Sequence, residues 1–156
     1  MSTKNELETK IPPPLLGLIT ALMMWLLAQV LPTLSLVSSN LYRVGIVVML
    51  AGFCLDLIAL FQFRKNNTSI SPLSPHKAST MVITGLYKYT RNPMYLGLLI
   101  SLSGWALYLG NLASFVCLPI FVRVLTRFQI LPEERILAEK FGMPYEEYLK
   151  QVRRWI

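Results

Sequence analysis

The chain has 156 residues, of which 54% are hydrophobic and 15% are charged, and its formal net charge is +7. Soluble domains carry about 25% charged residues. Here the apolar residues fall in blocks between basic stretches, so the composition excludes an ordinary soluble domain and favours a membrane protein. A basic chain can bind nucleic acid, but these charges flank apolar blocks, so the expected partners are membrane lipids with anionic head groups and not nucleic acid. The length predicts a single domain over residues 1–156.

The apolar blocks predict an all-α membrane protein with four transmembrane helices. A span needs about 20 apolar residues, and four blocks come near this length, at residues 15–31, 41–63, 94–109 and 112–131. The third block is short, and only Gly110 and Asn111 separate it from the fourth, so these two should form a helical hairpin. Residues 64–84 are rich in Ser, Thr, Asn and Pro, which favours an irregular loop.

The basic residues predict how these four spans are oriented. They lie in the N-terminal tail, in the middle loop and at the C-terminal end. The turns at residues 32–40 and 110–111 carry none, and Arg43 is the exception, just inside the second span. Cytoplasmic segments carry the excess of Lys and Arg. We therefore expect both termini and the middle loop in the cytoplasm.

Residues 132–156 are expected to form a cytoplasmic helical cap. Pro132 followed by Glu133 and Glu134 is typical of a helix start, since proline fits the first turn and acids favour the positive end of the helix dipole. Gly142 is a typical stop. Residues 144–147 begin another short helix, whose basic amphipathic character suits a membrane surface.

The densest polar and aromatic stretch lies at residues 85–97, with the sequence Gly-Leu-Tyr-Lys-Tyr-Thr-Arg-Asn-Pro-Met-Tyr-Leu-Gly. Asn92 is a good N-cap and Pro93 suits the first turn of a helix, so the chain should turn here into the third span. That first turn offers free backbone N–H groups and a partial positive charge. Such a helix start can hold an anionic group, for example a carboxylate.

This stretch resembles the signature of the integral-membrane methyltransferases related to isoprenylcysteine carboxyl methyltransferase and phospholipid methyltransferase. The pattern is Gly-x-Tyr-x-x-x-Arg-Asn-Pro-x-Tyr-x-Gly, with Asn-Thr-Ser-Ile-Ser-Pro upstream at residues 67–72 and Pro-Glu-Glu-Arg downstream at residues 132–135. The resemblance covers about residues 64–156. It implies methyl transfer from S-adenosylmethionine to a lipophilic small molecule or lipid, at an active site that faces the cytoplasm.

The resemblance also implies where the cofactor is bound. The implied contacts are Tyr87, Lys88, Tyr89, Thr90, Tyr95, Ile100, Ser101, Leu102, Ser103 and Glu133. An aromatic face can stack on adenine or lie beside a sulfonium, and a carboxylate can accept hydrogen bonds from ribose hydroxyls or an amino group. From the residues alone, Glu133 equally fits a surface helix bridged to nearby arginines, and the tyrosines fit an interfacial aromatic belt.

Two departures from the family pattern concern the acceptor. The signature often has histidine where this chain has Asn92. The relatives that methylate prenylated cysteine have an arginine one helical turn before the cofactor glutamate, where this chain has Gln129. Arg127 lies on a different helical face, so Arg91 and Gln129 are the candidate substrate-binding residues. We expect a membrane-soluble small molecule or lipid as acceptor, rather than a prenylated protein C-terminus.

No residue is assigned to catalysis or to a metal ion. Methyl transfer depends on proximity and alignment more than on a strong base. Cys54 and Cys117 have neither metal-ligand nor disulfide spacing, and His76, the single histidine, is expected to be solvated. Asp56 is the one acid deep in a span, where it should pair with a group on a neighbouring helix or mark a polar cavity.

The sequence leaves the methylated atom and the oligomeric state open, and two other functions remain as alternatives. One is a non-catalytic membrane binding or assembly protein that keeps the same scaffold. The other is a membrane reductase that uses a dinucleotide, although the chain has no Gly-rich dinucleotide fingerprint.

Overall fold

The computed structural model describes residues 11–34, 39–65 and 81–156. His76 and the upstream motif at residues 67–72 lie outside these ranges. The regular elements within them are all helices, which confirms the all-α prediction. They are α1 (Pro13–Val30), η1 (Pro32–Leu34), α2 (Ser39–Lys65), η3 (Gly85–Lys88), α3 (Pro93–Leu109), α4 (Leu112–Phe115), α5 (Cys117–Leu125), η4 (Thr126–Ile130), α6 (Leu131–Phe141) and α7 (Met143–Gln151).

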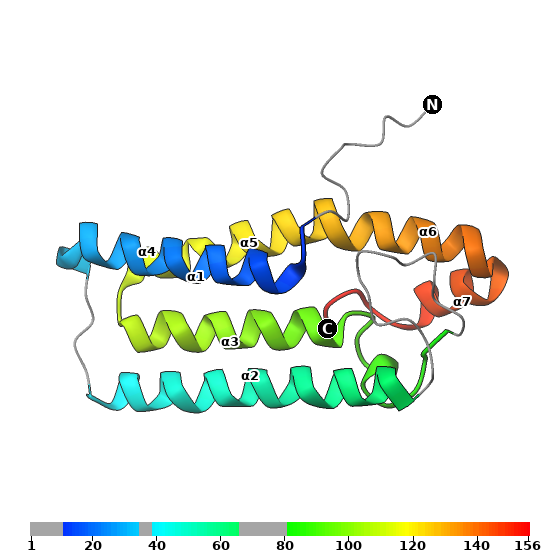
Figure 1. Ribbon diagram of the computed structural model, residues 1–156, viewed down its shortest axis with the longest axis horizontal. Coiled ribbons are helices and arrows are strands. Elements are labelled where there is room, and N and C mark those ends of the chain that lie inside the picture. The colour runs from blue at the N-terminus through cyan, green and yellow to red at the C-terminus, as the bar shows by residue number, and fades with distance from the viewer. Residues whose placement is uncertain (1–10, 35–38, 66–80) are drawn as a thin grey trace.

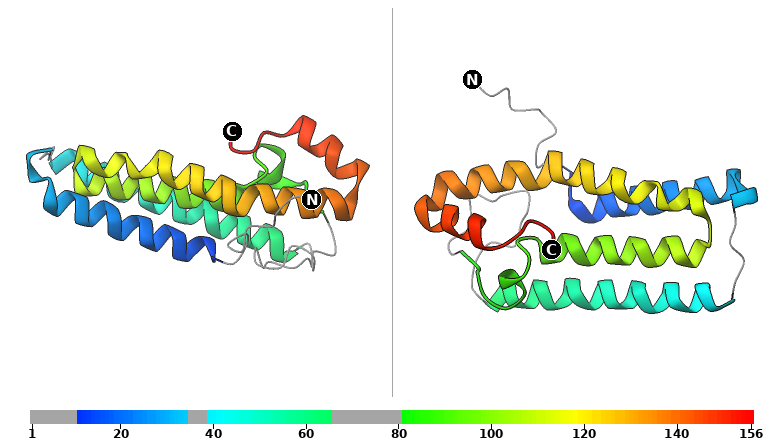
Figure 2. Two further views of the ribbon diagram at one scale, coloured as in Figure 1. Left: turned by 90° about the horizontal axis from the view of Figure 1, so that it is seen from above. Right: turned by 180° about the vertical axis from the view of Figure 1, so that it is seen from behind.

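The helices form an elongated bundle in which α1, α2, α3 and the series α4 to α6 run along the long axis (Figure 1). The core lies between α1, α3 and the α4-to-α6 series. Its buried side chains are Met24, Tyr95, Leu102, Ala106, Cys117, Phe121, Leu125 and Ile130. Helix α2 packs on the other side of α3, and the start of α1, the end of α2, the start of α3 and α7 all lie at one end of the bundle (Figure 2).

Three helices are long and apolar enough to cross a membrane. They cover Pro13–Val30, Asn40–Gln62 and Leu112–Phe141, and the apolar helix Pro93–Leu109 is shorter than these three. The first two agree with the expected spans within a few residues. The third is longer than expected, because it continues through the residues that were assigned to the cap.

The long helix over Leu112–Phe141, which comprises α4 to α6 and is called the fourth helix below, corrects the predicted break at residue 132. Pro132 has no backbone N–H, so it cannot donate the α-helical bond to the carbonyl of Phe128. The chain absorbs this loss in η4, a π-helical turn in which the Leu131 N–H donates to Thr126 O. The helix continues to Phe141 and ends at Gly142, whose φ of +59° confirms the expected stop. Only α7, which begins at Met143, is a separate cap helix.

The hairpin between α3 and the fourth helix is as tight as the sequence predicted. Gly110 has a left-handed backbone with φ of +56°, and the side chain of Asn111 caps the next helix by accepting from the Ala113 N–H at 2.9 Å. Asn111 also donates to Leu31 O at 2.9 Å, and Ser114 Oγ donates to Met24 O at 3.0 Å. These bonds hold α1 antiparallel to the fourth helix.

Glycines bring α2 and α3 into close backbone contact. A Cβ built on Gly52 would lie 2.6 Å from Gly97 O, and one built on Gly104 would lie 2.7 Å from Gly45 O. These four glycines are spaced seven residues apart on each helix. Small residues at such positions let membrane helices approach closely, and this contact holds α2 against the helix that carries the polar signature.

Replacing Gly52 by alanine should lower the thermal stability more than replacing Gly17. The new Cβ at position 52 would lie 2.5 Å from the backbone N of Ser101, so the helices would have to separate, whereas at position 17 it meets only the flexible end of the Leu98 side chain at 2.8 Å. Overpacking of this kind costs about 1–3 kcal/mol, and the gain in helix propensity is shared by both variants. Thermal unfolding in one detergent measures the difference; equal midpoints would contradict the close contact.

Candidate active site

The polar signature begins in a short loop that the end of α2 holds in place. Gly85 has φ of +63°, which opens the turn into η3. The side-chain oxygen of Gln62 accepts a hydrogen bond from the Leu86 N–H at 2.9 Å. The α2 helix therefore positions the loop that leads into α3.

Two buried polar side chains, one from α3 and one from the fourth helix, meet at the carboxylate of Glu133. Tyr95 OH donates to Glu133 Oε1 at 2.7 Å, and Gln129 Nε2 donates to the same oxygen at 2.6 Å. Tyr95 and Gln129 are 8% and 4% exposed, so both donors are shielded from water. We call this group the Tyr95–Gln129–Glu133 cluster. It stabilises an acid at a buried position by charge-assisted hydrogen bonds.

The π-helical turn η4 carries one member of this cluster. Gln129 is part of η4, and Glu133 follows in the first turn of α6. Single π turns inside α-helices are often found at functional sites. In this chain the turn lets one helix carry both Gln129 and Glu133 past Pro132 without a break.

The C-terminal residues fold back over the start of α3. Arg91 N donates to Arg153 O at 3.0 Å, and the Thr90 hydroxyl and the Asn92 amide donate to Arg154 O at 3.2 Å and 3.0 Å. The expected N-cap role of the Asn92 side chain is therefore wrong: it makes no capping bond, because its amide is used by the C-terminal backbone. Pro93 is at the first helical position, as expected.

Glu134 joins this returning segment to the signature. Its carboxylate accepts two hydrogen bonds from Arg154, at 3.0 Å and 2.7 Å, and lies 3.4 Å from the Arg91 guanidinium. The bidentate contact with Glu134 raises the pKa of Arg154 above its ordinary value. We call Arg91, Glu134 and Arg154, with the backbone bonds at residues 90–92, the C-terminal clasp.

Helix α7 supports the same loop from the other side. Tyr148 OH donates to Tyr87 O at 2.7 Å, and Tyr145 and Tyr148 are in aromatic contact with their ring centres 6.1 Å apart. Burial raises the pKa of Tyr148 to about 12, so the phenol stays protonated and remains a donor at neutral pH.

The structure brings some of the implied cofactor residues together and separates others. Tyr95 and Glu133 are in direct contact, and Tyr87 and Thr90 are buried in the loop beside them. Lys88 and Tyr89 are exposed. The remaining four lie on different sides of α3: Ser101 Oγ donates to Met49 O at 3.4 Å in the α2 interface, Leu102 is in the core, and Ile100 and Ser103 are half-buried.

Two buried polar atoms have no hydrogen-bond partner within the described ranges, Asp56 Oδ1 and Arg91 Nε. Asp56 lies against Gly97 in the α2–α3 interface, so the expected pairing is not seen for this oxygen. Arg91 Nε is a hydrogen-bond donor beside the clasp that has no acceptor among the described residues. Both candidate substrate-binding residues are thus at the site, Gln129 bonded to Glu133 and Arg91 with an unused donor.

Sequence reasoning missed the clasp, Gln62 and the contact between Tyr148 and the loop. Glu134 belongs to the downstream part of the family pattern at residues 132–135, so its place in that pattern was the available signal. Among the described residues, no group of three His, Cys, Asp or Glu side chains could hold a metal ion.

Comparison with known proteins decides the family. The phospholipid methyltransferase family matches residues 40–143. The chain belongs to this family. With three helices that are long and apolar enough to cross a membrane, it is an integral membrane protein.

The individual relatives include two named methyltransferases. The chain is 46% identical over 63 residues to an uncharacterised protein of Haemophilus influenzae, which covers 40% of this chain and all of that protein. It is 35% identical over 97 residues to protein-S-isoprenylcysteine O-methyltransferase of Schizosaccharomyces pombe, which covers 60% of this chain and 40% of that enzyme.

A third relative is methanethiol S-methyltransferase of Pseudomonas deceptionensis, 30% identical over 109 residues, which covers 68% of this chain and 39% of that enzyme. The chain thus spans about two fifths of the length of the two named enzymes. No solved structure matches it.

Proposed function

We propose that this protein transfers a methyl group from S-adenosylmethionine to a lipophilic acceptor in the membrane. The observation that carries the proposal is the Tyr95–Gln129–Glu133 cluster. It joins the polar signature and the fourth helix of a phospholipid methyltransferase family member around one buried carboxylate. When bound, the cofactor supplies a methyl carbon attached to a positively charged sulfur.

The side chains at this end of the bundle suit such a cofactor. Both donors in the cluster reach Glu133 Oε1, so they hold the carboxylate in place while Oε2 can accept from a ribose hydroxyl or an amino group. Arg91 Nε is a buried donor without a partner among the described residues, which suits an anion such as a carboxylate. The rings of Tyr87 and Tyr95 offer apolar faces beside these charged groups.

The protein's part in the reaction is then binding and alignment. A methyl group moves by in-line displacement, which needs the acceptor and the methyl carbon held close and collinear. This fits a site where the carboxylate of Glu133 already accepts two hydrogen bonds. An apolar acceptor would enter from the bilayer and the cofactor from the cytoplasm.

The proposed membrane placement has four spans, with α3 as the short third one and both termini in the cytoplasm. It rests on the basic residues at one end of the bundle. Single cysteines introduced at Ser38 and Ser74 should therefore be labelled by impermeant thiol reagents from opposite sides of the membrane, after Cys54 and Cys117 have been replaced by alanine. Labelling of both from the same side would overturn this topology.

We expect the acceptor to be a membrane-soluble small molecule or lipid without a prenylcysteine carboxylate. A neutral amide cannot form the bidentate charged contact that arginine makes with a carboxylate, and the amide of Gln129 already donates to Glu133 at 2.6 Å. Acetyl-farnesylcysteine offered with labelled cofactor should give little methyl ester. Rapid ester formation that is lost in Glu133→Ala would show that this inference from Gln129 is wrong.

Equilibrium titration of the detergent-solubilised protein with S-adenosylhomocysteine separates the proposal from its rivals. We expect saturable binding of this ligand and none of reduced nicotinamide dinucleotide. Binding of the dinucleotide alone would favour a membrane reductase. Binding of neither would favour a non-catalytic protein on the same scaffold.

A further inference from the structure

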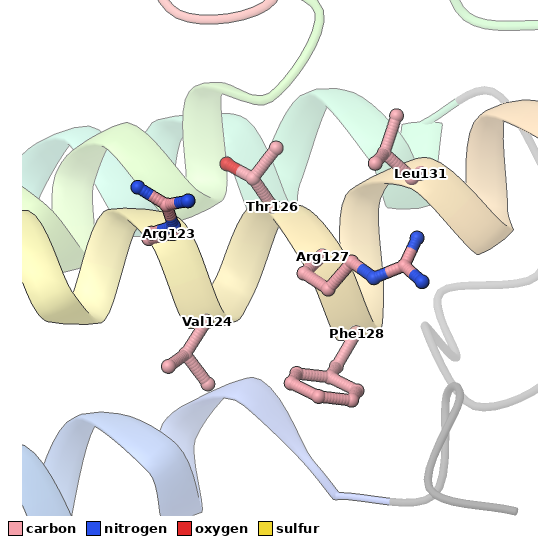
Figure 3. Close-up of a pocket in the computed structure, with 6 residues that line it drawn as sticks. All are labelled: Arg123, Val124, Thr126, Arg127, Phe128 and Leu131. Carbon is pink, nitrogen blue, oxygen red and sulfur yellow. The ribbon is translucent and has the colours of Figure 1, made fainter. Parts of the chain in front are cut away.

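A groove of about 600 Å³ lies along the fourth helix, apart from the candidate active site. It is lined by Arg123, Val124, Thr126, Arg127, Phe128 and Leu131 (Figure 3). Val124 and Phe128 point toward α1, whereas the two arginines lie on the same stretch of the fourth helix with their guanidinium groups extended from it. The groove therefore combines two cations with an apolar wall.

The two arginines are available to a ligand. Both are exposed, and in the part of the chain that the structure describes neither forms an ion pair or a side-chain hydrogen bond. Phe128 and Val124 are half-buried and Leu131 is 37% exposed. Unpaired charges beside the apolar part of a membrane are costly, so an anion that also carries an apolar chain is the complementary ligand.

The antiparallel packing of α1 shows at which level of the membrane these arginines lie. Ser114 Oγ donates to Met24 O at 3.0 Å. Pro13 lies eleven residues before Met24, and Leu125 lies eleven residues after Ser114. Because the two helices are antiparallel, Pro13 and Leu125 lie at the same level. Arg123 and Arg127 therefore lie on either side of the level where α1 begins, and the fourth helix continues past that point (Figure 1).

The start of α1 marks the level of the lipid head groups. Helix α1 has 18 residues, which corresponds to about 27 Å at the rise of an α-helix, close to the ~30 Å hydrocarbon core of a bilayer. The two guanidinium groups thus lie near the plane of the lipid phosphates, with Val124 beside that plane and Phe128 and Leu131 on the side away from the hydrocarbon core.

The groove is separate from the acceptor site. Gln129 is 4% exposed and bonded to Glu133 inside the bundle. Arg127, two residues earlier in η4, is exposed on the outside of the helix. A ligand held by Arg123 and Arg127 therefore faces the surrounding lipid and not the Tyr95–Gln129–Glu133 cluster.

We propose that this groove binds an anionic phospholipid of the surrounding leaflet. The phosphate lies between Arg123 and Arg127, because guanidinium groups form bidentate hydrogen bonds with phosphate oxygens. The acyl chain runs from there past Val124 toward the hydrocarbon core, while Phe128 lies beside the head group. The proposal rests on the membrane placement of the fourth helix and not on methyl transfer.

Competition between phosphatidylglycerol and phosphatidylcholine for the detergent-solubilised protein, read by native mass spectrometry, tests this directly. The wild-type protein should retain phosphatidylglycerol preferentially. A basic residue near the membrane surface is worth about 1 kcal/mol toward anionic lipid, so Arg123→Gln with Arg127→Gln should reduce the preference by up to about thirty-fold. Arg123→Lys with Arg127→Lys should keep most of it.

The matched control is Lys150→Gln with Arg153→Gln, which removes the same charge from exposed side chains of the C-terminal region. It should leave the lipid preference unchanged. An equal loss in this control, or equal retention of both lipids by the wild-type protein, would overturn the site. S-adenosylhomocysteine binding should be the same in the groove variant and in wild type, so failure of the lipid site and failure of the proposed methyl transfer give different results.

Discussion

S-adenosylhomocysteine should bind the Glu133→Ala variant at least about ten-fold more weakly than the wild-type protein. Glu133 is the acid of the Tyr95–Gln129–Glu133 cluster, and a charge-assisted hydrogen bond to it is worth about 1.5–3 kcal/mol. The substitution also leaves the buried donors of Tyr95 and Gln129 without their acceptor. Calorimetric titration in detergent measures the affinity of both proteins.

The control for this result is Glu139→Ala, because Glu139 is exposed on the same helix α6. Its affinity should equal that of the wild-type protein. Glu133→Gln preserves the shape of the side chain, so a loss in this variant assigns the effect to the negative charge. Wild-type affinity in Glu133→Ala, with the helical content unchanged, would remove Glu133 from the site.

The second large effect is expected at the C-terminal clasp. Replacing Glu134 by alanine leaves the Arg154 and Arg91 guanidinium groups, which are 33% and 11% exposed, without their carboxylate. Breaking a fully buried pair costs about 3–5 kcal/mol, and the partial exposure of Arg154 reduces this to about 2–3 kcal/mol. We expect a lower unfolding midpoint, and rapid trypsin cleavage after Arg153 and Arg154, which the clasp protects in the wild-type protein.

Glu147→Ala is the matched control for the clasp, since Glu147 is an exposed acid on α7. It should change neither the unfolding midpoint nor the rate of cleavage. If Glu134→Ala resembles this control in both measurements, the C-terminal segment is held by its backbone bonds alone and the carboxylate contributes little.

The apolar blocks, the turns and the family could be predicted because each depends on local signals. The hairpin at Gly110 and the stop at Gly142 need a left-handed backbone, which glycine adopts without strain. The resemblance implied that Tyr95 and Glu133 both contact the cofactor, but not that they bond to each other, and 38 residues separate them in the chain. Periodicity carries no information about such a pairing.

The remaining features depend on how distant segments pack. Pro132 followed by two acids looks the same whether it starts a helix or follows a π turn, so the continuous fourth helix was not predicted. Asparagine is a typical N-cap residue, but the side-chain amide of Asn92 donates its hydrogen bond to the backbone oxygen of Arg154 instead. The glycines of α2 and α3 allow the two backbones to approach closely, and this role becomes visible only when the two helices are placed side by side.

The most direct test of the central claim is methyl transfer itself. The purified protein is incubated with membrane lipids and S-adenosylmethionine that carries a labelled methyl group, and the lipid extract is examined by mass spectrometry. We predict a labelled lipid-soluble product with the wild-type protein and with Glu139→Ala, and none with Glu133→Ala. No labelled product from the wild-type protein, or equal amounts from Glu133→Ala, would contradict methyl transfer at the Tyr95–Gln129–Glu133 cluster.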